Sequence, residues 1–211
     1  MPTPDRQLAT AVWRHIKQHR GNAAEPFYLA IDGRSGSGKS TLAAQLQALI
    51  GVDHTTVIDG DSFYCGGSAA RWDTRTAAQN ADAVINRQLL KQVIRSLQTT
   101  GAATWSAFDW HNDNWDSDNP PAEHKPRAAC EKPWVIVEGV YTAHPALASL
   151  FHYAVLLDCC KQLSQRRTRA RDADDYCPAW AQRWTEAEDC YFSQLAPGER
   201  FDLVLSLPVS I

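Results

Sequence analysis

The chain has 211 residues, an ordinary apolar content of 44 % and a formal net charge of −3. This length suits one well-packed domain over residues 1–211, and the slight acidity gives no reason to expect a nucleic-acid or anionic-membrane partner. No stretch approaches 18 uninterrupted apolar residues, so no membrane-spanning helix is predicted.

The first 25 residues predict an N-terminal helix in which charged side chains such as Arg14 and Lys17 interrupt the apolar positions. This segment lacks the apolar centre of a signal peptide, so we expect a cytoplasmic protein. The six cysteines include no C-x-x-C pair, which favours reduced thiols over disulfides or a zinc site.

Short and almost continuously apolar runs predict strands that are covered on both faces. They lie at 27–31, 55–58, 103–108 (the weakest), 134–137, 153–157 and 201–205. Helical apolar spacing is found over 39–50 and 82–97, while the polar stretch 111–126 is predicted to be a surface loop. Strands that alternate with helices predict a three-layer α/β/α fold around a five-stranded, mainly parallel sheet.

A phosphate-binding loop follows the first strand directly. Residues 33–40 read G-R-S-G-S-G-K-S and match the pattern G-x-x-x-x-G-K-[ST] at every specified position. Glycines allow backbone N–H groups to face phosphate oxygens, the following helix presents its N-terminus, Lys39 supplies a charge, and Ser40 offers a hydroxyl to Mg²⁺. The predicted nucleotide-binding residues are Gly33, Arg34, Ser35, Gly36, Ser37, Gly38, Lys39, Ser40 and Thr41.

Other motifs narrow the class of P-loop protein. The sequence contains no D-x-x-G, no [NT]-K-x-D and no L-S-G-G-Q, which argues against small GTPases and ABC ATPases. Asp61 lies just beyond the second predicted strand, where ligands bind in open α/β sheets. A carboxylate there could take the proton of an acceptor hydroxyl or bind Mg²⁺ through water, although it could also simply cap a turn.

At this point the chain resembles the uridine kinase-like family of P-loop kinases, which includes relatives acting on pantothenate and phosphoribulose. The resemblance rests on the phosphate loop, on D-S-F-Y at 61–64, on V-I-V-E-G-V at 135–140, and on an arginine-rich segment ending at Asp172. It implies that Asp61 is the catalytic base and that Glu138 helps Ser40 and Asp61 to hold hydrated Mg²⁺. Glu138 could instead be a structural carboxylate.

The same resemblance implies that residues 160–192 form a short arginine-rich lid and its following helix. Arg167 and Arg171 would clamp the transferring phosphate, because guanidinium groups bind phosphate oxygens bidentately. The alternative is a solvated basic helix face paired with nearby aspartates.

The acceptor site departs from the family pattern, because no D-x-P-x-A-F-D stretch is present. We assign acceptor binding to Tyr64, Asp73, Asp109 and Trp110. Asp73 beside Trp72 could bind hydroxyls and stack a ring, and Trp110 could form a stacking wall, although tryptophan is more often part of a core.

The leading hypothesis is an ATP- or GTP-dependent, Mg²⁺-requiring kinase that phosphorylates a hydroxyl of a nucleoside or sugar-like small molecule. Two alternatives remain open. One is a nucleotide-binding regulatory protein with a degenerate acceptor site, and the other is a partner-coupled P-loop nucleotide hydrolase. The sequence does not indicate the oligomeric state.

Overall fold

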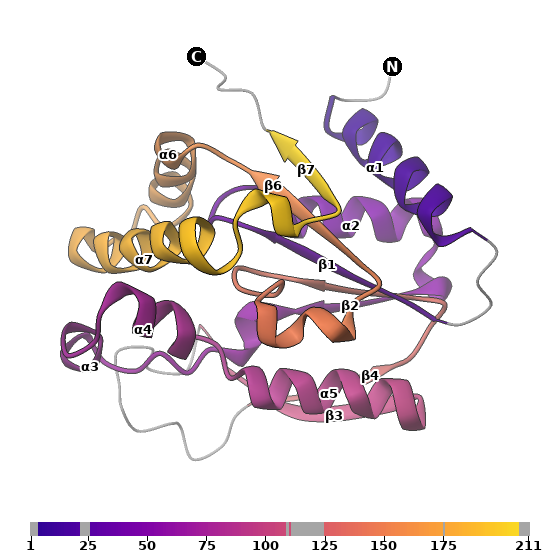
Figure 1. Ribbon diagram of the computed structural model, residues 1–211, viewed down its shortest axis with the longest axis horizontal. Coiled ribbons are helices and arrows are strands. Elements are labelled where there is room, and N and C mark those ends of the chain that lie inside the picture. Colours follow the sequence, from indigo (N-terminus) through magenta and orange to yellow (C-terminus); the bar gives the residue numbers. More distant parts are fainter. Residues whose placement is uncertain (1–3, 22–25, 109, 111–124, 175, 207–211) are drawn as a thin grey trace.

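The computed structural model describes residues 4–21, 26–108, 110, 125–174 and 176–206 (Figure 1). The strands are β1 (Phe27–Gly33), β2 (Thr55–Asp59), β3 (Ala102–Ala107), β4 (Lys125–Cys130), β5 (Trp134–Glu138), β6 (Tyr153–Asp158) and β7 (Leu203–Ser206). The α-helices are α1 (Pro4–Arg20), α2 (Lys39–Ile50), α3 (Ala69–Asp73), α4 (Ala77–Ala83), α5 (Arg87–Thr100), α6 (Lys161–Arg171) and α7 (Pro178–Cys190). Short 3₁₀ turns include η1 (Val52–His54), η2 (Gly60–Phe63), η3 (Pro145–Leu150) and η5 (Gly198–Arg200), and a π-helical turn, η4 (Tyr191–Leu195), continues α7.

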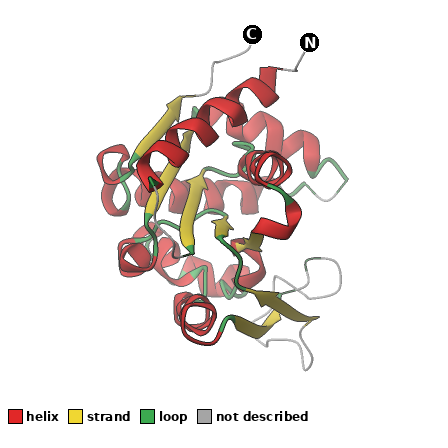
Figure 2. Cartoon of the chain, turned by 90° about the vertical axis from the view of Figure 1, so that its right-hand side faces the viewer, coloured by secondary structure: helices red, strands yellow, loops and turns green. Residues whose placement is uncertain are grey.

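The main sheet has five parallel strands in the order β2-β5-β1-β6-β7. Helices cover both of its faces (Figure 2), which confirms the predicted three-layer α/β/α fold. In the pairing register Glu138 lies beside both Asp59 and Ile31. The carboxyl ends of β2, β5 and β1 therefore meet at one edge, where ligands bind in sheets of this kind.

Side chains alternate between two hydrophobic cores because successive strand residues point to opposite faces. On β1, Leu29 and Ile31 face a core with α1 and α2, to which Val12 and Leu46 contribute. Tyr28 faces the other core, which is built mainly on α5 and α7. Burial on both faces explains why the strands read as continuous apolar runs.

The weak run at 103–108 forms a strand, but this strand lies outside the main sheet. β3 pairs antiparallel with β4 in a separate two-stranded sheet. The sequence analysis missed β4, because K-P-R-A-A-C carries no apolar pattern. The predicted loop therefore ends earlier than expected, and its residues 111–124 lie outside the described residues.

The helix predicted over 82–97 is in fact two helices. α4 ends at Ala83 and α5 begins at Arg87, because the Asn86 side chain accepts a hydrogen bond from the backbone N–H of Leu89 and caps the second helix. Apolar periodicity alone does not reveal such a cap. Within the described residues, the predicted N-terminal helix covers Pro4–Arg20, and Gly21 lies in a turn after it.

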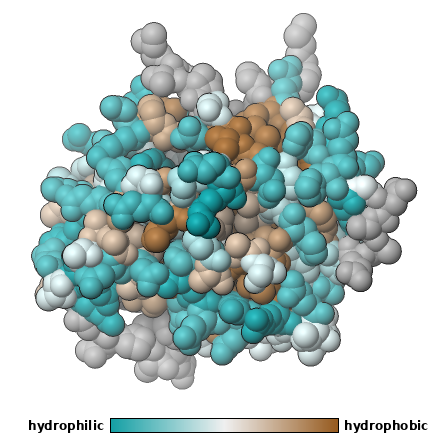
Figure 3. All heavy atoms as spheres, viewed as in Figure 1, coloured by the Kyte–Doolittle hydropathy of each residue, from teal (hydrophilic) through white to brown (hydrophobic). Residues whose placement is uncertain are grey.

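The face seen in Figure 1 is largely hydrophilic, with apolar side chains in small patches (Figure 3). One patch lies over the edge strand β7, where Val204 is 40 % exposed. Within the described residues, no helix combines the length and the apolarity needed to cross a membrane.

Candidate active site

The loop between β1 and α2 has the backbone shape that phosphate binding requires. Gly38 adopts a left-handed conformation (φ 96°) as the N-cap of α2 and leaves the helix without a side-chain cap. The first N–H groups of α2 thus have no side-chain acceptor, which suits an anion. Lys39 begins the helix, and its ammonium group donates to the backbone carbonyl of Arg34 at 3.1 Å.

Three carboxylates gather at the ends of β2 and β5. Asp61 donates its backbone N–H to the side chain of Asp59 at 2.9 Å, while Glu138 lies beside Asp59 in the sheet. Burial raises the pKa of Glu138 to about 7, against the opposing effect of a hydrogen bond from Ser40. Ser40 and Glu138 therefore lie close together, and their role in holding a metal stays a prediction.

This constellation fits Mg²⁺ better than a metal with a complete protein cage. Hard oxygen donors are the ligands that Mg²⁺ prefers, and this ion usually takes one or two carboxylates together with water and substrate phosphates. In the described part of the chain, no group of three or more His, Cys, Asp or Glu side chains is arranged to hold a metal by itself.

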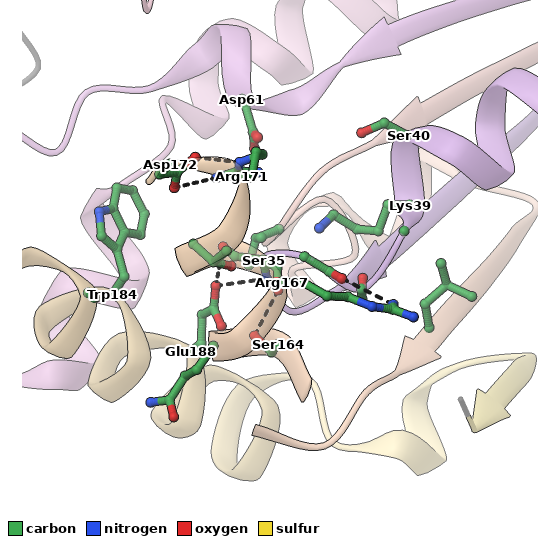
Figure 4. Close-up of a pocket in the computed structure, with 18 of the residues that line it drawn as sticks. Ser35, Lys39, Ser40, Asp61, Ser164, Arg167, Arg171, Asp172, Trp184 and Glu188 are labelled. Carbon is green, nitrogen blue, oxygen red and sulfur yellow. Dashed lines mark hydrogen bonds and ion pairs between the residues drawn. The ribbon is translucent and has the colours of Figure 1, made fainter. Parts of the chain in front are cut away.

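The phosphate loop and the carboxylates of Asp59 and Asp61 open into one cavity of about 1150 Å³ (Figure 4). Its polar wall includes the loop from Ser35 to Thr41, together with Asp59 and Asp61. Its lining also includes aromatic side chains from elements that are distant in sequence: Tyr64, Trp110, Tyr141, Tyr176, Trp180 and Trp184. The cavity can therefore hold both a charged phosphate chain and an apolar or ring-bearing group.

The predicted lid comprises α6 and α7 and packs onto the phosphate loop. Arg167 donates to the backbone carbonyl of Gly36 at 3.3 Å, and Arg171 forms a bidentate pair with Asp172 at 2.6 and 3.0 Å. Both arginines line the cavity (Figure 4). A Cβ atom on Gly36 would lie only 3.0 Å from the carbonyl of Ser164, so the close approach of α6 requires glycine there.

Two of the predicted acceptor residues lie together beside the predicted base. The indole N–H of Trp110 donates to the backbone carbonyl of Asp61 at 3.1 Å, and the Tyr64 and Trp110 rings are 4.9 Å apart. Trp184, on α7, lies 5.8 Å from Tyr64.

The structure does not bring Asp73 to this cavity. Arg183 binds its carboxylate with two hydrogen bonds of 2.7 Å and lowers its pKa. Trp72 is 1 % exposed and belongs to the core, so it offers no ring face for stacking. The assignment of this pair to the acceptor is therefore corrected, whereas the predicted Asp109 lies outside the described residues.

A comparison of the sequence with models of protein families identifies the family of the chain. The model of the phosphoribulokinase / uridine kinase family matches residues 28–176, which is more than half of the chain. The chain belongs to the phosphoribulokinase/uridine kinase family. Membership supports phosphoryl transfer to a small-molecule hydroxyl by a P-loop kinase, and it leaves the acceptor open.

Solved structures share the fold at low identity. A possible uridine kinase from Bacillus stearothermophilus is 20 % identical with a TM-score of 0.69, covering 95 % of this chain and 98 % of that one. A candidate fructose transport system kinase from Silicibacter sp. TM1040 is 17 % identical with a TM-score of 0.65, covering 93 % and 98 %. No curated protein sequence matches the chain.

Next to this candidate site, sequence reasoning missed the buried carboxylate of Asp32 at the end of β1. It accepts hydrogen bonds from the backbone N–H groups of Gly33, Tyr141 and Ala143 and from the hydroxyl of Tyr191, at 2.7 to 3.1 Å. Burial raises its pKa to about 6, although these donors favour the charged form. Asp32 thereby joins the phosphate loop to the turn after β5. A carboxylate that ends an apolar strand was the signal available in the sequence.

The contribution of α7 was also missed. Trp180, Trp184 and Glu188 follow one another at four-residue spacing and line the cavity from one side of the helix. The sequence predicted a helix after the lid but offered no means of placing its tryptophans against the phosphate loop.

Proposed function

We propose that the chain transfers the terminal phosphoryl group of ATP, in the presence of Mg²⁺, to a hydroxyl of a small ring-bearing molecule such as a nucleoside. The observation that carries this proposal is that Asp61 shares one cavity with the phosphate loop and with aromatic side chains. Family membership supports the reaction class, and the aromatic side chains that line the cavity support the choice of a ring-bearing acceptor.

The phosphate end of the site would position the donor. The loop N–H groups, the start of α2 and Lys39 would hold the β- and γ-phosphates, since all of them offer positive charge or free donors. Ser40 and Glu138 would hold Mg²⁺, which neutralises phosphate charge when it is bound. Arg167 and Arg171 would stabilise the negative charge that spreads over the transferred group.

The acceptor end would orient the nucleophile. Asp61 would accept the proton of the acceptor hydroxyl, and its main chain is held against the Trp110 indole. The Tyr64, Trp110 and Trp184 rings would bind a flat or apolar part of the acceptor, because aromatic faces prefer such partners. The residues would thus supply positioning and charge neutralisation.

Acceptor-dependent release of ADP tests this function. The purified protein is incubated with Mg-ATP and, separately, uridine, D-fructose and pantothenate, beside Asp61→Asn and Lys39→Ala. We expect release that depends on one acceptor and falls by roughly 10²-fold or more in Asp61→Asn. Asp53→Asn is the control and should match the wild type, because it removes an exposed carboxylate before β2, at the opposite end of that strand from Asp59 and Asp61.

The alternatives give different results in the same assay. ATP binding with no rise in ADP release for any acceptor would favour a regulatory protein. Release in water alone, unchanged by acceptors, would favour a hydrolase. A repetition with Mg-GTP decides between the two nucleotide donors.

A further inference from the structure

One buried carboxylate contacts the phosphate loop but has no part in the proposed transfer. Glu188, on α7, is 3 % exposed and accepts hydrogen bonds from the backbone N–H of Ser35 at 3.0 Å and from its hydroxyl at 2.6 Å. A second oxygen of the same carboxylate lies 3.7 Å from the guanidinium of Arg34. Figure 4 shows the Glu188 side chain pointing from its helix to Ser35.

Further contacts from both lid helices hold Ser35 and Arg34. The hydroxyl of Ser164, on α6, donates to the backbone carbonyl of Ser35 at 2.7 Å. Asp189 binds Arg34 at 2.7 Å and also pairs with Lys161 of α6 at 2.7 Å. The N–H, hydroxyl and carbonyl of Ser35 are thus all bound by the lid, directly before the part of the loop that faces phosphate.

Folding alone gives little reason to keep a carboxylate at this position. Burial of an ionised group is costly, and apolar side chains of similar volume often replace buried ion pairs with no loss of stability. Burial raises the pKa of Glu188, while the Ser35 hydrogen bonds and the nearby Lys39 and Arg34 charges oppose this shift. The cost is explained if the carboxylate fixes the shape of the loop.

We propose that Glu188 is a positioning residue that holds Ser35, and through it the phosphate loop, in the shape that binds nucleotide phosphates. This inference rests on the nucleotide-binding part of the proposed function. Because Glu188 belongs to α7, its hydrogen bonds to Ser35 couple the conformation of the phosphate loop to the position of the lid. Disruption of the contact should therefore weaken nucleotide binding without unfolding the protein.

Binding of Mg-ADP and Mg-GDP, measured by calorimetry beside thermal unfolding without nucleotide, tests this role. Glu188→Leu keeps the volume and removes the acceptor atoms. We expect its dissociation constant for the nucleotide to rise about ten-fold or more. The unfolding temperature should fall, because the two Ser35 donors lose their acceptor, but the protein should remain folded at the temperature of the binding assay. Glu188→Gln keeps an oxygen acceptor for Ser35 and should recover most of the affinity. Glu186→Leu, at an exposed position of the same helix, should bind as the wild type does.

Ser35→Ala provides a second test if Glu188→Leu does not fold. It removes one of the two hydrogen bonds and keeps the backbone N–H that also binds Glu188, so it should weaken nucleotide binding a few-fold with a smaller loss of stability than Glu188→Leu. The inference is overturned if Glu188→Leu binds nucleotide like the wild type, if Gln and Leu behave alike, or if affinity falls only in step with stability. A wild-type protein that binds neither nucleotide overturns the proposed function as well, whereas one that binds nucleotide but phosphorylates no acceptor overturns only the proposed function.

Discussion

The indole N–H of Trp110 donates to the backbone carbonyl of Asp61 at 3.1 Å, which attaches an aromatic ring to the residue proposed as catalytic base. Trp110 keeps 40 % of its surface exposed and lines the cavity. Under the proposed function, an acceptor that stacks on its ring would present its hydroxyl close to Asp61. The contact would then link acceptor binding to the position of the base.

Replacement of Trp110 should affect the acceptor more than the donor. Trp110→Ala removes both the ring and the hydrogen bond to Asp61, so we expect kcat/KM for the acceptor to fall by about ten-fold or more. The KM for ATP should change little. Steady-state kinetics with each substrate varied in turn measure this difference. Val52→Ala, at another exposed apolar position, is the control, and equal losses for donor and acceptor would contradict the assignment.

Glu138 should set the Mg²⁺ requirement. Glu138→Gln removes the carboxylate that contacts Ser40, so the Mg²⁺ concentration for half-maximal activity should rise by roughly 10- to 100-fold. The measurement is a Mg²⁺ titration at fixed nucleotide concentration, beside Glu199→Gln at an exposed position. Coincident titration curves for Glu138→Gln and the wild type would remove Glu138 from the metal site. Chelation of Mg²⁺ should abolish transfer in all variants.

Two neighbouring tyrosines should respond differently to loss of their hydroxyl groups. The rings of Tyr141 and Tyr191 are both buried and lie 4.7 Å apart. The Tyr191 hydroxyl donates to Asp32 at 2.7 Å, whereas that of Tyr141 has no hydrogen-bond partner among the described residues. Tyr191→Phe should therefore lower the free energy of unfolding by about 1–3 kcal/mol, while Tyr141→Phe should leave it unchanged or raise it by about 1 kcal/mol.

Urea denaturation of the two variants measures this difference. Tyr141 also has a left-handed backbone conformation, with φ of 72°, but the substitution keeps its Cβ and so does not alter that strain. Similar losses in both variants would show that the Tyr141 hydroxyl has a stabilising partner.

The free energy of unfolding should decrease at acidic pH because His144 is buried in its neutral form. Burial, aided by the charge of Arg87, lowers the pKa of His144 to about 4, although Asp82 lies 3.4 Å away and acts in the opposite direction. The unfolded chain, with a histidine pKa of about 6.5, binds the proton first. This contribution to stability is therefore present above about pH 6.5 and is lost as the pH falls toward 4.

His144→Asn isolates this contribution. Asparagine can replace the histidine nitrogen that accepts a hydrogen bond from the backbone N–H of Ala146, so the cap of η3 is kept. Between pH 7 and 5 the wild type should lose about 2 kcal/mol more unfolding free energy than the variant. Parallel pH profiles would show that His144 is not buried in its neutral form.

Local patterns in the sequence were sufficient for the fold class and for the position of the phosphate-loop motif between the first strand and the helix that follows it. The phosphate loop depends on neighbouring residues, since glycine, lysine and serine act there through backbone freedom, charge and a hydroxyl at fixed spacing. Continuous apolar runs at 27–31 and 134–137 indicated strands covered on both faces, because such strands have no solvent-facing side to vary. The family resemblance then indicated Asp61 and Glu138, which the structure places in the cavity or beside Ser40.

Only the tertiary structure decided which distant side chains meet. Sequence analysis assigned both Asp73 and Asp61 to the site. In the structure, packing of α7 pairs Asp73 with Arg183, whereas Asp61 lines the cavity. Asp32 and Glu188 are acidic residues that acquire their roles from hydrogen bonds across more than 100 residues of sequence. Contacts of this kind depend on how helices cross the sheet, which is set by the sum of many packing interactions and leaves no short pattern in the chain.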